Sequence, residues 1–303
     1  MLKGAFYGLT AAATWGGLYV VSDIVLETIP PFTLLTIRLV IALLLLGGIA
    51  RFSSKLVYPN RRGALALLGV GFIGFGISVG AQFVGTDKST AFNGALITSA
   101  APAFILLFAA LILREKLTVQ RIAAVILATI GVIVIIDPAN VNFSSDTFVG
   151  DIALAFAALT WGLYSVLVRR VSGQYDTLVV SLYAMLGGLI LTIPAAAQEL
   201  SVRPIGAVDG PILLGVLYLS VIAMALAMWL WNRAFALVEA SIASLFFFAQ
   251  PLVGGLLSVL VRGQALTPNL QLGSILIIGG VLLTIVTPRA SPERTASDIV
   301  EPT

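Results

Sequence analysis

The 303-residue sequence contains no cysteine and no histidine, and charged residues make up only 10% of it. The missing thiolates and imidazoles argue against a transition-metal site and exclude a cysteine nucleophile. We therefore expect neither a metal nor another cofactor. Soluble globular domains carry about a quarter charged residues, so the small charged fraction also argues against that class of protein.

Carboxylates are missing where membrane chemistry would need them. No Asp or Glu lies at the middle of an apolar segment, and the acidic residues nearest the segments lie at their ends or in loops: Asp23, Glu27, Asp87, Glu115, Asp151 and Glu239. A buried acid is the usual group that exchanges a proton for a substrate, so proton coupling is disfavoured. An intramembrane lipid-modifying enzyme would need a nucleophile, an acid/base pair or a metal, and remains a distant alternative.

What the chain does have is apolar sequence, with 59% hydrophobic residues and a mean hydropathy of +1.07. A helix needs about 20 apolar residues to cross a bilayer. The sequence predicts ten such helices, at 4–25, 31–50, 63–85, 93–113, 119–136, 149–168, 177–197, 210–232, 240–261 and 270–287. Their long continuous runs exclude a membrane barrel. The first run is too long for a signal peptide, so we expect it to stay as a helix.

Basic residues occur in alternate loops. Lys and Arg gather at positions 3, 51–62, 114–121, 169–170, 233 and 289–294, and the intervening loops hold only Lys88, Arg203 and Arg262. This bias predicts a multi-pass inner (plasma) membrane protein with both termini cytoplasmic. It also explains the basic balance of the chain without nucleic acid, which we do not expect as a partner.

The sequence repeats itself about halfway along. Thr14-Trp15-Gly16 returns as Thr160-Trp161-Gly162, Ala101-Pro102 as Gln250-Pro251, and Gly131-Val132 as Gly280-Val281. Because each unit has five helices, the second copy must enter the membrane from the opposite side, which makes the repeat inverted. We expect a first repeat at 4–137, an extracytoplasmic linker at 138–148, a second repeat at 149–288 and a cytoplasmic tail at 289–303.

These landmarks, together with Pro30-Pro31, Arg38 and the run from Arg114 to Thr118, resemble the EamA unit. That unit is the repeated domain of ten-helix exporters in the drug/metabolite transporter (DMT) superfamily, and the chain looks most like the YddG-type amino-acid exporters. The resemblance implies alternating access around a central cavity, with the fifth and tenth helices as peripheral scaffold. The second copy has no Arg in its second helix and has Gln264 where the first has Glu115, so the roles of Arg38 and Glu115 are not duplicated.

Two prolines point to the same cavity. Pro102 and Pro251 lie near the middle of their spans, where each would free a carbonyl four residues back, at Thr98 and Phe247. Such a break is tolerated in lipid only if a neighbouring helix, a hydroxyl or cavity water satisfies the carbonyl. A packing kink is the alternative, and the symmetric placement favours a cavity or hinge.

Aromatic residues lie at the same depth. Trp15 and Trp161 are both halfway through their spans, whereas tryptophans that anchor a helix at the membrane surface lie at helix ends. We interpret them as an interior surface that could stack against a substrate, with aromatic packing between helices as the alternative. Trp229 and Trp231, at the end of the eighth span, are interpreted as interface anchors.

Polar residues within the spans should point inward, either towards a substrate or towards a neighbouring helix. The complete candidate substrate-binding set is Trp15, Tyr19, Phe75, Ser78, Gln82, Ala95, Ser99, Pro102, Trp161, Tyr164, Ser165, Phe247, Gln250 and Pro251. Arg38 is the one full charge well inside a span, and we expect it to form a structural or gating ion pair with Asp23.

The expected cavity is neutral, aromatic and weakly polar. It suits a small neutral or zwitterionic solute, and we predict a monomeric exporter of amino acids, including aromatic ones, that works by facilitated alternating access in contact with membrane lipid. Export of amphipathic metabolites or drugs is the alternative. A channel would need a continuous polar face, which the spans lack.

Overall fold

The computed structural model describes residues 2–53, 56–89, 94, 97–136, 147–253 and 268–285. Within these residues all regular structure is helical, which confirms the predicted all-α class. The described parts of the first repeat are α1 (Leu2–Thr14), η1 (Trp15–Gly17), α2 (Leu18–Leu26), α3 (Pro31–Arg51), α4 (Arg61–Gly71), η2 (Phe72–Ser78), α5 (Val79–Lys88), α7 (Ala101–Leu113) and α8 (Val119–Ile136). Those of the second are α9 (Phe148–Val171), α10 (Thr177–Val202), α11 (Gly210–Leu217), η4 (Tyr218–Leu226), α12 (Ala227–Leu237), α13 (Ala240–Phe246) and α15 (Pro268–Ile285).

Six continuous helical stretches are long and apolar enough to cross a membrane, at Leu2–Leu26, Pro31–Arg51, Arg61–Lys88, Phe148–Val171, Thr177–Val202 and Gly210–Leu237. Shorter apolar helices lie on the other four predicted spans, at Ala101–Leu113, Val119–Gly131, Ala240–Val253 and Gln271–Gly280. The predicted linker and tail lie almost wholly outside the described residues.

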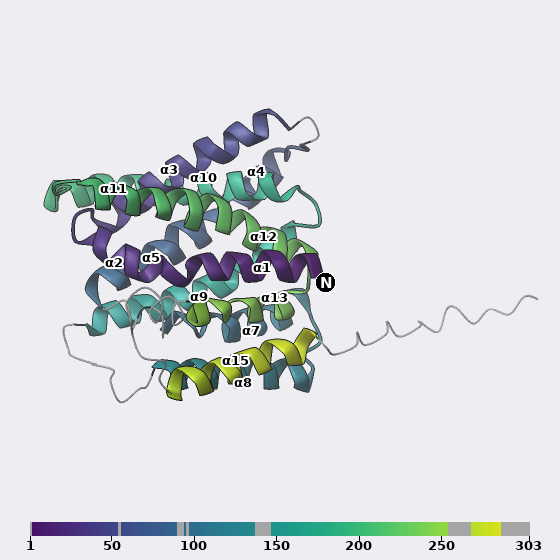
Figure 1. Ribbon diagram of the computed structural model, residues 1–303. Coiled ribbons are helices and arrows are strands. Elements are labelled where there is room, and N and C mark those ends of the chain that lie inside the picture. Colours follow the sequence, from purple (N-terminus) through teal and green to yellow (C-terminus); the bar gives the residue numbers. More distant parts are fainter. Residues whose placement is uncertain are drawn as a thin grey trace, which may run out of the picture.

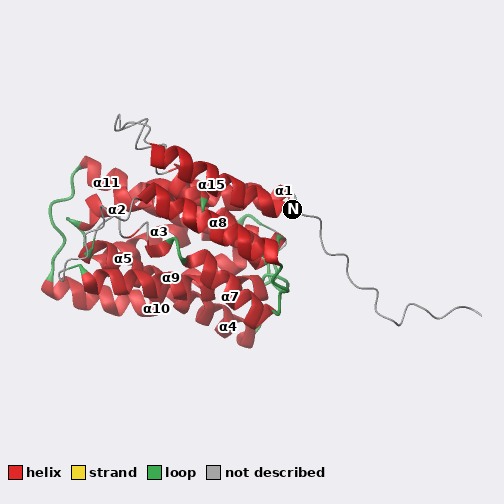
Figure 2. Cartoon of the chain, turned by 90° about the horizontal axis from the view of Figure 1, so that it is seen from below, coloured by secondary structure: helices red, strands yellow, loops and turns green. Residues whose placement is uncertain are grey.

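The helices run side by side in one bundle, with α8 and α15 together at its edge (Figure 1). The same pair is adjacent when the bundle is seen from below (Figure 2). Glycine permits this contact, because a Cβ on Gly131 would lie 2.7 Å from the Gly273 oxygen and one on Gly280 would lie 2.8 Å from the Ala124 oxygen. The repeated Gly-Val landmark therefore marks the point where the last helices of the two repeats pack together.

Two spans contain a π-helical turn at matching positions. Phe72–Ser78 interrupts the third span and Tyr218–Leu226 the eighth. A π-turn displaces the backbone hydrogen bonds by one residue, and such turns are frequent at functional sites. Here the second turn supplies two acceptors for side chains of the first repeat, the carbonyls of Leu219 and Ala223.

Glu115 joins the end of α7 to the start of α13. It follows Arg114, whose left-handed backbone (φ 57°) ends α7. The Glu115 carboxylate accepts hydrogen bonds from the N–H groups of Ala240 and Ser241, at 2.8 and 3.0 Å, and from the Ser241 hydroxyl at 2.7 Å. It thus satisfies N–H groups that α13 itself cannot, and its charge stabilises the positive end of that helix.

Glu199, in α10, caps α3 in the same way. It accepts hydrogen bonds from the backbone N–H groups of Phe32 and Thr33 and from the Thr33 hydroxyl. Pro31 occupies the first position of α3, where a missing N–H costs nothing. Two carboxylates at helix ends therefore have structural roles and are not available for chemistry in the membrane.

Glu115→Ala is expected to lower the stability of the purified protein by about 2 kcal/mol, the effect of losing a charged helix cap. Thermal unfolding in detergent measures the change. Glu27→Ala is the matched control, because Glu27 is an exposed acid at the end of α2. Equal unfolding temperatures for the two variants would contradict the capping role.

Candidate functional site

A cavity lies inside the bundle, and its empty space, including the part open to solvent, is about 490 Å³. Residues of both repeats line it: Trp15, Leu18, Arg38, Ser78, Val79, Gln82, Thr98, Ala101, Ala157, Ala158, Trp161, Met228, Phe247 and Gln250. No Asp or Glu is among these lining residues. The cavity is the candidate site for a transported solute.

The two spans that contain Pro102 and Pro251 are interrupted beside the cavity. The fourth span breaks at Ser99 and Ala100 before α7 begins, and the ninth breaks at Phe247 and Phe248. The structure thus contains the two interruptions expected from the sequence. Thr98 and Ala101 flank the first break and line the cavity, as do Phe247, within the second break, and Gln250, two residues after it. Pro102 and Pro251 do not line it.

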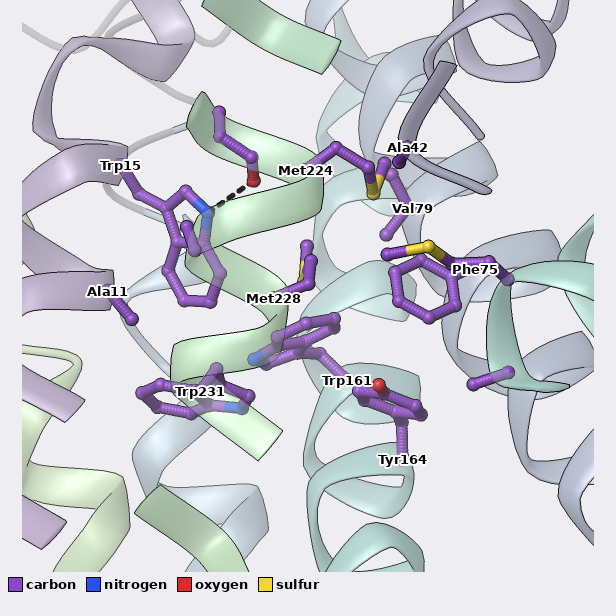
Figure 3. Packing of buried hydrophobic residues seen from close by; sticks show 14 of the residues in the cluster. Ala11, Trp15, Ala42, Phe75, Val79, Trp161, Tyr164, Met224, Met228 and Trp231 are labelled. Carbon is purple, nitrogen blue, oxygen red and sulfur yellow. Dashed lines mark hydrogen bonds between the residues drawn. The ribbon is translucent and has the colours of Figure 1, made fainter. Parts of the chain in front are cut away.

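Trp15 and Trp161, from the repeated Trp-Gly landmark, meet at the cavity (Figure 3). Their ring centroids are 5.8 Å apart and the rings are nearly perpendicular, at 81°. The Trp15 indole Nε1 donates to the Ala223 carbonyl at 2.9 Å, which fixes its ring. The Trp161 Nε1 is buried and has no hydrogen-bond partner among the described residues. Trp161 therefore offers both an aromatic face and an unused donor.

Trp231 corrects an expectation from the sequence. It is not an interface anchor, because it is 0% exposed and packs 5.3 Å from Trp15 and 6.2 Å from Trp161 between ring centroids. Its Nε1 donates to the Ser165 hydroxyl at 3.3 Å. Trp229 is only half-buried and packs against Tyr7. Trp231 thus supports the two cavity tryptophans from behind (Figure 3).

A hydrogen-bonded group forms the polar part of the wall. The Tyr19 hydroxyl, which is not itself a lining group, bonds the Thr98 hydroxyl and accepts from the Gln82 amide at 2.7 Å. The Ser78 hydroxyl donates to the Ala157 carbonyl at 2.8 Å. Tyr19 therefore positions two cavity side chains.

Several predicted residues lie behind the wall. Phe75 packs edge-on to Tyr164 at 5.4 Å, and the Tyr164 hydroxyl donates to the Asn232 side-chain oxygen at 3.0 Å. Ser165 and Ser99 are buried without lining the cavity. Ala95 lies outside the described residues.

Half of the wall consists of residues that were not predicted to bind a solute: Leu18, Val79, Thr98, Ala101, Ala157, Ala158 and Met228. Six of these seven are apolar and look like ordinary packing residues in a sequence. The signal that could have found some of them is their position beside predicted site residues. Leu18 is next to Tyr19, and Thr98 is one helical turn before Pro102.

Arg38 differs most from expectation. Asp23 is exposed while Arg38 is 0% exposed, and the predicted pair between them is absent. The Arg38 Nε donates to the Leu219 carbonyl at 3.0 Å, and the guanidinium carbon lies 4.6 Å from the centroid of the Phe83 ring. Both terminal nitrogens are buried without a hydrogen-bond partner. The cavity is therefore not neutral, because it carries one positive charge.

The profile of the EamA-like transporter family matches this chain twice, at residues 2–137 and 148–286. An uncharacterized inner membrane transporter of Salmonella typhimurium, YicL, is 31% identical over 95% of this chain and 96% of its own length. An uncharacterized transporter of Archaeoglobus fulgidus is 24% identical over 89% of this chain and 93% of its own.

A solved structure titled "Crystal structure of protein" has the same fold, with a TM-score of 0.78 at 22% identity, and the match covers 94% of this chain and 96% of that one. The family match spans both halves of the chain, and the described helices coincide with all ten predicted spans. The chain therefore belongs to the EamA-like transporter family and is a multi-pass inner-membrane transporter, not an enzyme.

Proposed function

We propose that this transporter exports small neutral or zwitterionic metabolites, foremost amino acids including aromatic ones, by alternating access. The observation that carries the proposal is a cavity between the two repeats with two tryptophans and two glutamines in its wall. Tryptophan faces stack well on aromatic side chains. The glutamine amides can bond the polar end of such a solute.

Contacts between the two repeats at both ends of the bundle support alternating access. At the end that carries residue 2, Arg121 of α8 forms a salt bridge with Glu239, just before α13. At the opposite end, Arg203 forms one with Asp87 at 2.7 Å. Both pairs are partly exposed to solvent, which weakens the attraction between the charges, so we expect that either end can open without a large energetic cost.

We propose that movement is facilitated rather than proton-coupled. No carboxylate is among the lining residues. Asp87 and Glu239 are held in salt bridges and Glu115 in a helix cap, while Asp23 and Glu27 are exposed. A carrier that exchanges protons usually holds a titratable acid inside the membrane. Accumulation of substrate driven by a pH gradient alone would overturn this part of the proposal.

Substitution of Trp161 tests the site. Uptake of labelled neutral amino acids, including phenylalanine and tyrosine, is measured into proteoliposomes with the native chain and with Trp161→Ala. We expect saturable uptake by the native chain and about a tenfold higher KM for the variant, corresponding to roughly 1.4 kcal/mol of lost stacking.

Phe156→Ala is the matched control, because Phe156 lies in the same helix and is 48% exposed on the lipid-facing surface. It should transport like the native chain. If folded native protein moves no member of the panel above empty vesicles, the amino-acid assignment fails. Uptake of amphipathic metabolites or drugs instead would then favour the alternative substrate class, for which the apolar lining residues Leu18, Val79 and Met228 provide contacts.

A further inference from the structure

The cavity holds a buried cation that lacks a counter-charge. The Arg38 side chain is 0% exposed, and its two terminal guanidinium nitrogens have no hydrogen-bond partner. The salt bridges formed between described residues, Arg121–Glu239 and Arg203–Asp87, do not involve it. Burying a charge without a partner is expensive, and truly unpaired charges are rare inside proteins. A group of opposite charge from outside the chain would satisfy it.

The surroundings of Arg38 hold the guanidinium in one orientation. Its Nε is bonded to the Leu219 carbonyl in the π-turn of the eighth span, and the Phe83 ring lies against it at 4.6 Å. These two contacts occupy the Nε edge and one face of the guanidinium group. The terminal nitrogens remain as a fork of parallel donors, the geometry that binds a carboxylate through two hydrogen bonds.

Other features of the cavity also favour an anionic group. The Trp161 Nε1 is a second buried donor without a partner in the described part of the chain. The helix α7 begins at Ala101, a lining residue, so the positive end of its dipole lies at the cavity. The lining residues include no Asp or Glu that could compete for the guanidinium.

We infer that Arg38 forms an anion subsite that binds the carboxylate of the transported solute through its two terminal guanidinium nitrogens. This inference rests on the proposed function and narrows it from neutral or zwitterionic solutes to solutes that carry a carboxylate. An amino acid would place its carboxylate on Arg38 and its side chain against the tryptophan wall. The matching amine or ester, which lacks the carboxylate, would leave the guanidinium unpaired and would be rejected.

The test compares four compounds that share a phenyl ring: phenylalanine, 3-phenylpropionate, phenethylamine and phenylalanine methyl ester. Binding to the purified full-length chain is measured as the ligand-dependent rise in unfolding temperature, and transport as competition with labelled phenylalanine. For the native chain we expect the two carboxylates to bind roughly 10- to 100-fold more tightly than the amine and the ester, the range for a lost hydrogen-bonded charge.

Arg38→Gln should weaken binding of both carboxylates by a similar factor, roughly 10- to 100-fold, and abolish the discrimination. Arg38→Lys keeps the charge but loses the pair of parallel donors, so its affinity for the carboxylates should lie between those of the native chain and Arg38→Gln. Arg170→Gln is the control, since it removes an exposed arginine from α9 and should change nothing. The unfolding temperature of Arg38→Gln without ligand should equal or exceed that of the native chain, because an unpaired buried charge has been removed.

The failures of the two proposals are distinguishable. If native protein transports phenylalanine, but binds the amine and ester equally well or binds carboxylates independently of Arg38, the subsite is overturned and the carrier stands. If amino acids are not transported but 3-phenylpropionate binds in an Arg38-dependent way, the subsite stands and the amino-acid assignment falls. Should Arg38→Gln not fold, the native chain's preference for 3-phenylpropionate over phenethylamine and the ester decides the question.

Discussion

Gly71→Ala is expected to prevent the bundle from assembling. Gly71 lies where the third span crosses α10, and a Cβ placed on it would be 1.9 Å from the Ala184 carbonyl oxygen and 2.3 Å from the Ala184 Cα. Those atoms are backbone of α10 at the fully buried Ala184, and backbone cannot move aside as a flexible side chain can. The two spans would have to separate, so the cost should exceed the roughly 1–3 kcal/mol of ordinary overpacking.

The expected result is loss of the monodisperse peak in size-exclusion chromatography and a strongly reduced yield. Gly69→Ala is a closely matched control in the same helix, because a Cβ there meets nothing within 4 Å. Alanine is also favoured over glycine in a helix by about 1 kcal/mol, so this control should fold at least as well as the native chain. Normal assembly of Gly71→Ala would show that the two helices are less closely packed than the structure indicates.

Close packing of this kind also shows which parts of the fold the sequence can predict. The ten spans are predictable because bilayer thickness sets their length and the absence of charge marks their interior. The described helices lie on all ten predicted ranges. The partners of individual glycines are not predictable, because the seven glycines of the third span look alike, although Gly71 meets backbone and Gly69 meets nothing.

The cavity was predictable where repetition gave a signal or where a span carried polar side chains, as at Ser78 and Gln82. Trp15, Trp161, Phe247 and Gln250 belong to or adjoin landmarks that occur in both halves, and all four line the cavity. Apolar wall residues such as Ala157 carry no mark that separates them from packing residues. The π-turns have no sequence signature either, yet one of them provides the carbonyls that fix two cavity side chains.

Arg38 shows a different limit. Its distance along the helices from Asp23 is compatible with an ion pair, but pairing depends on which way each helix is rotated. The structure exposes Asp23 and turns Arg38 inward to the Leu219 carbonyl. A charge inside a predicted span can therefore belong to the central cavity instead of to an ion pair at the membrane surface, and only tertiary structure distinguishes the two cases.

Helix rotation also gives different surroundings to two tryptophans that are two residues apart in sequence. Trp229 and Trp231 lie at the same end of the eighth span, where both resemble interface anchors. A spacing of two places them on different faces of one helix. Trp231 is fully buried against Trp15, Phe235 and other rings, whereas Trp229 remains half-buried beside Tyr7.

Trp231→Ala is therefore expected to destabilise the protein by about 3 kcal/mol, near the lower end for a tryptophan lost from a core, because helices in lipid gain little from hydrophobic transfer. Trp229→Ala, the matched control, should cost less than about 1 kcal/mol. Thermal unfolding of both variants in one detergent gives the difference. Because Trp231 supports Trp15 and Trp161 without lining the cavity, its loss should also raise the KM for substrate. Equal unfolding temperatures for the two variants would contradict the buried position of Trp231.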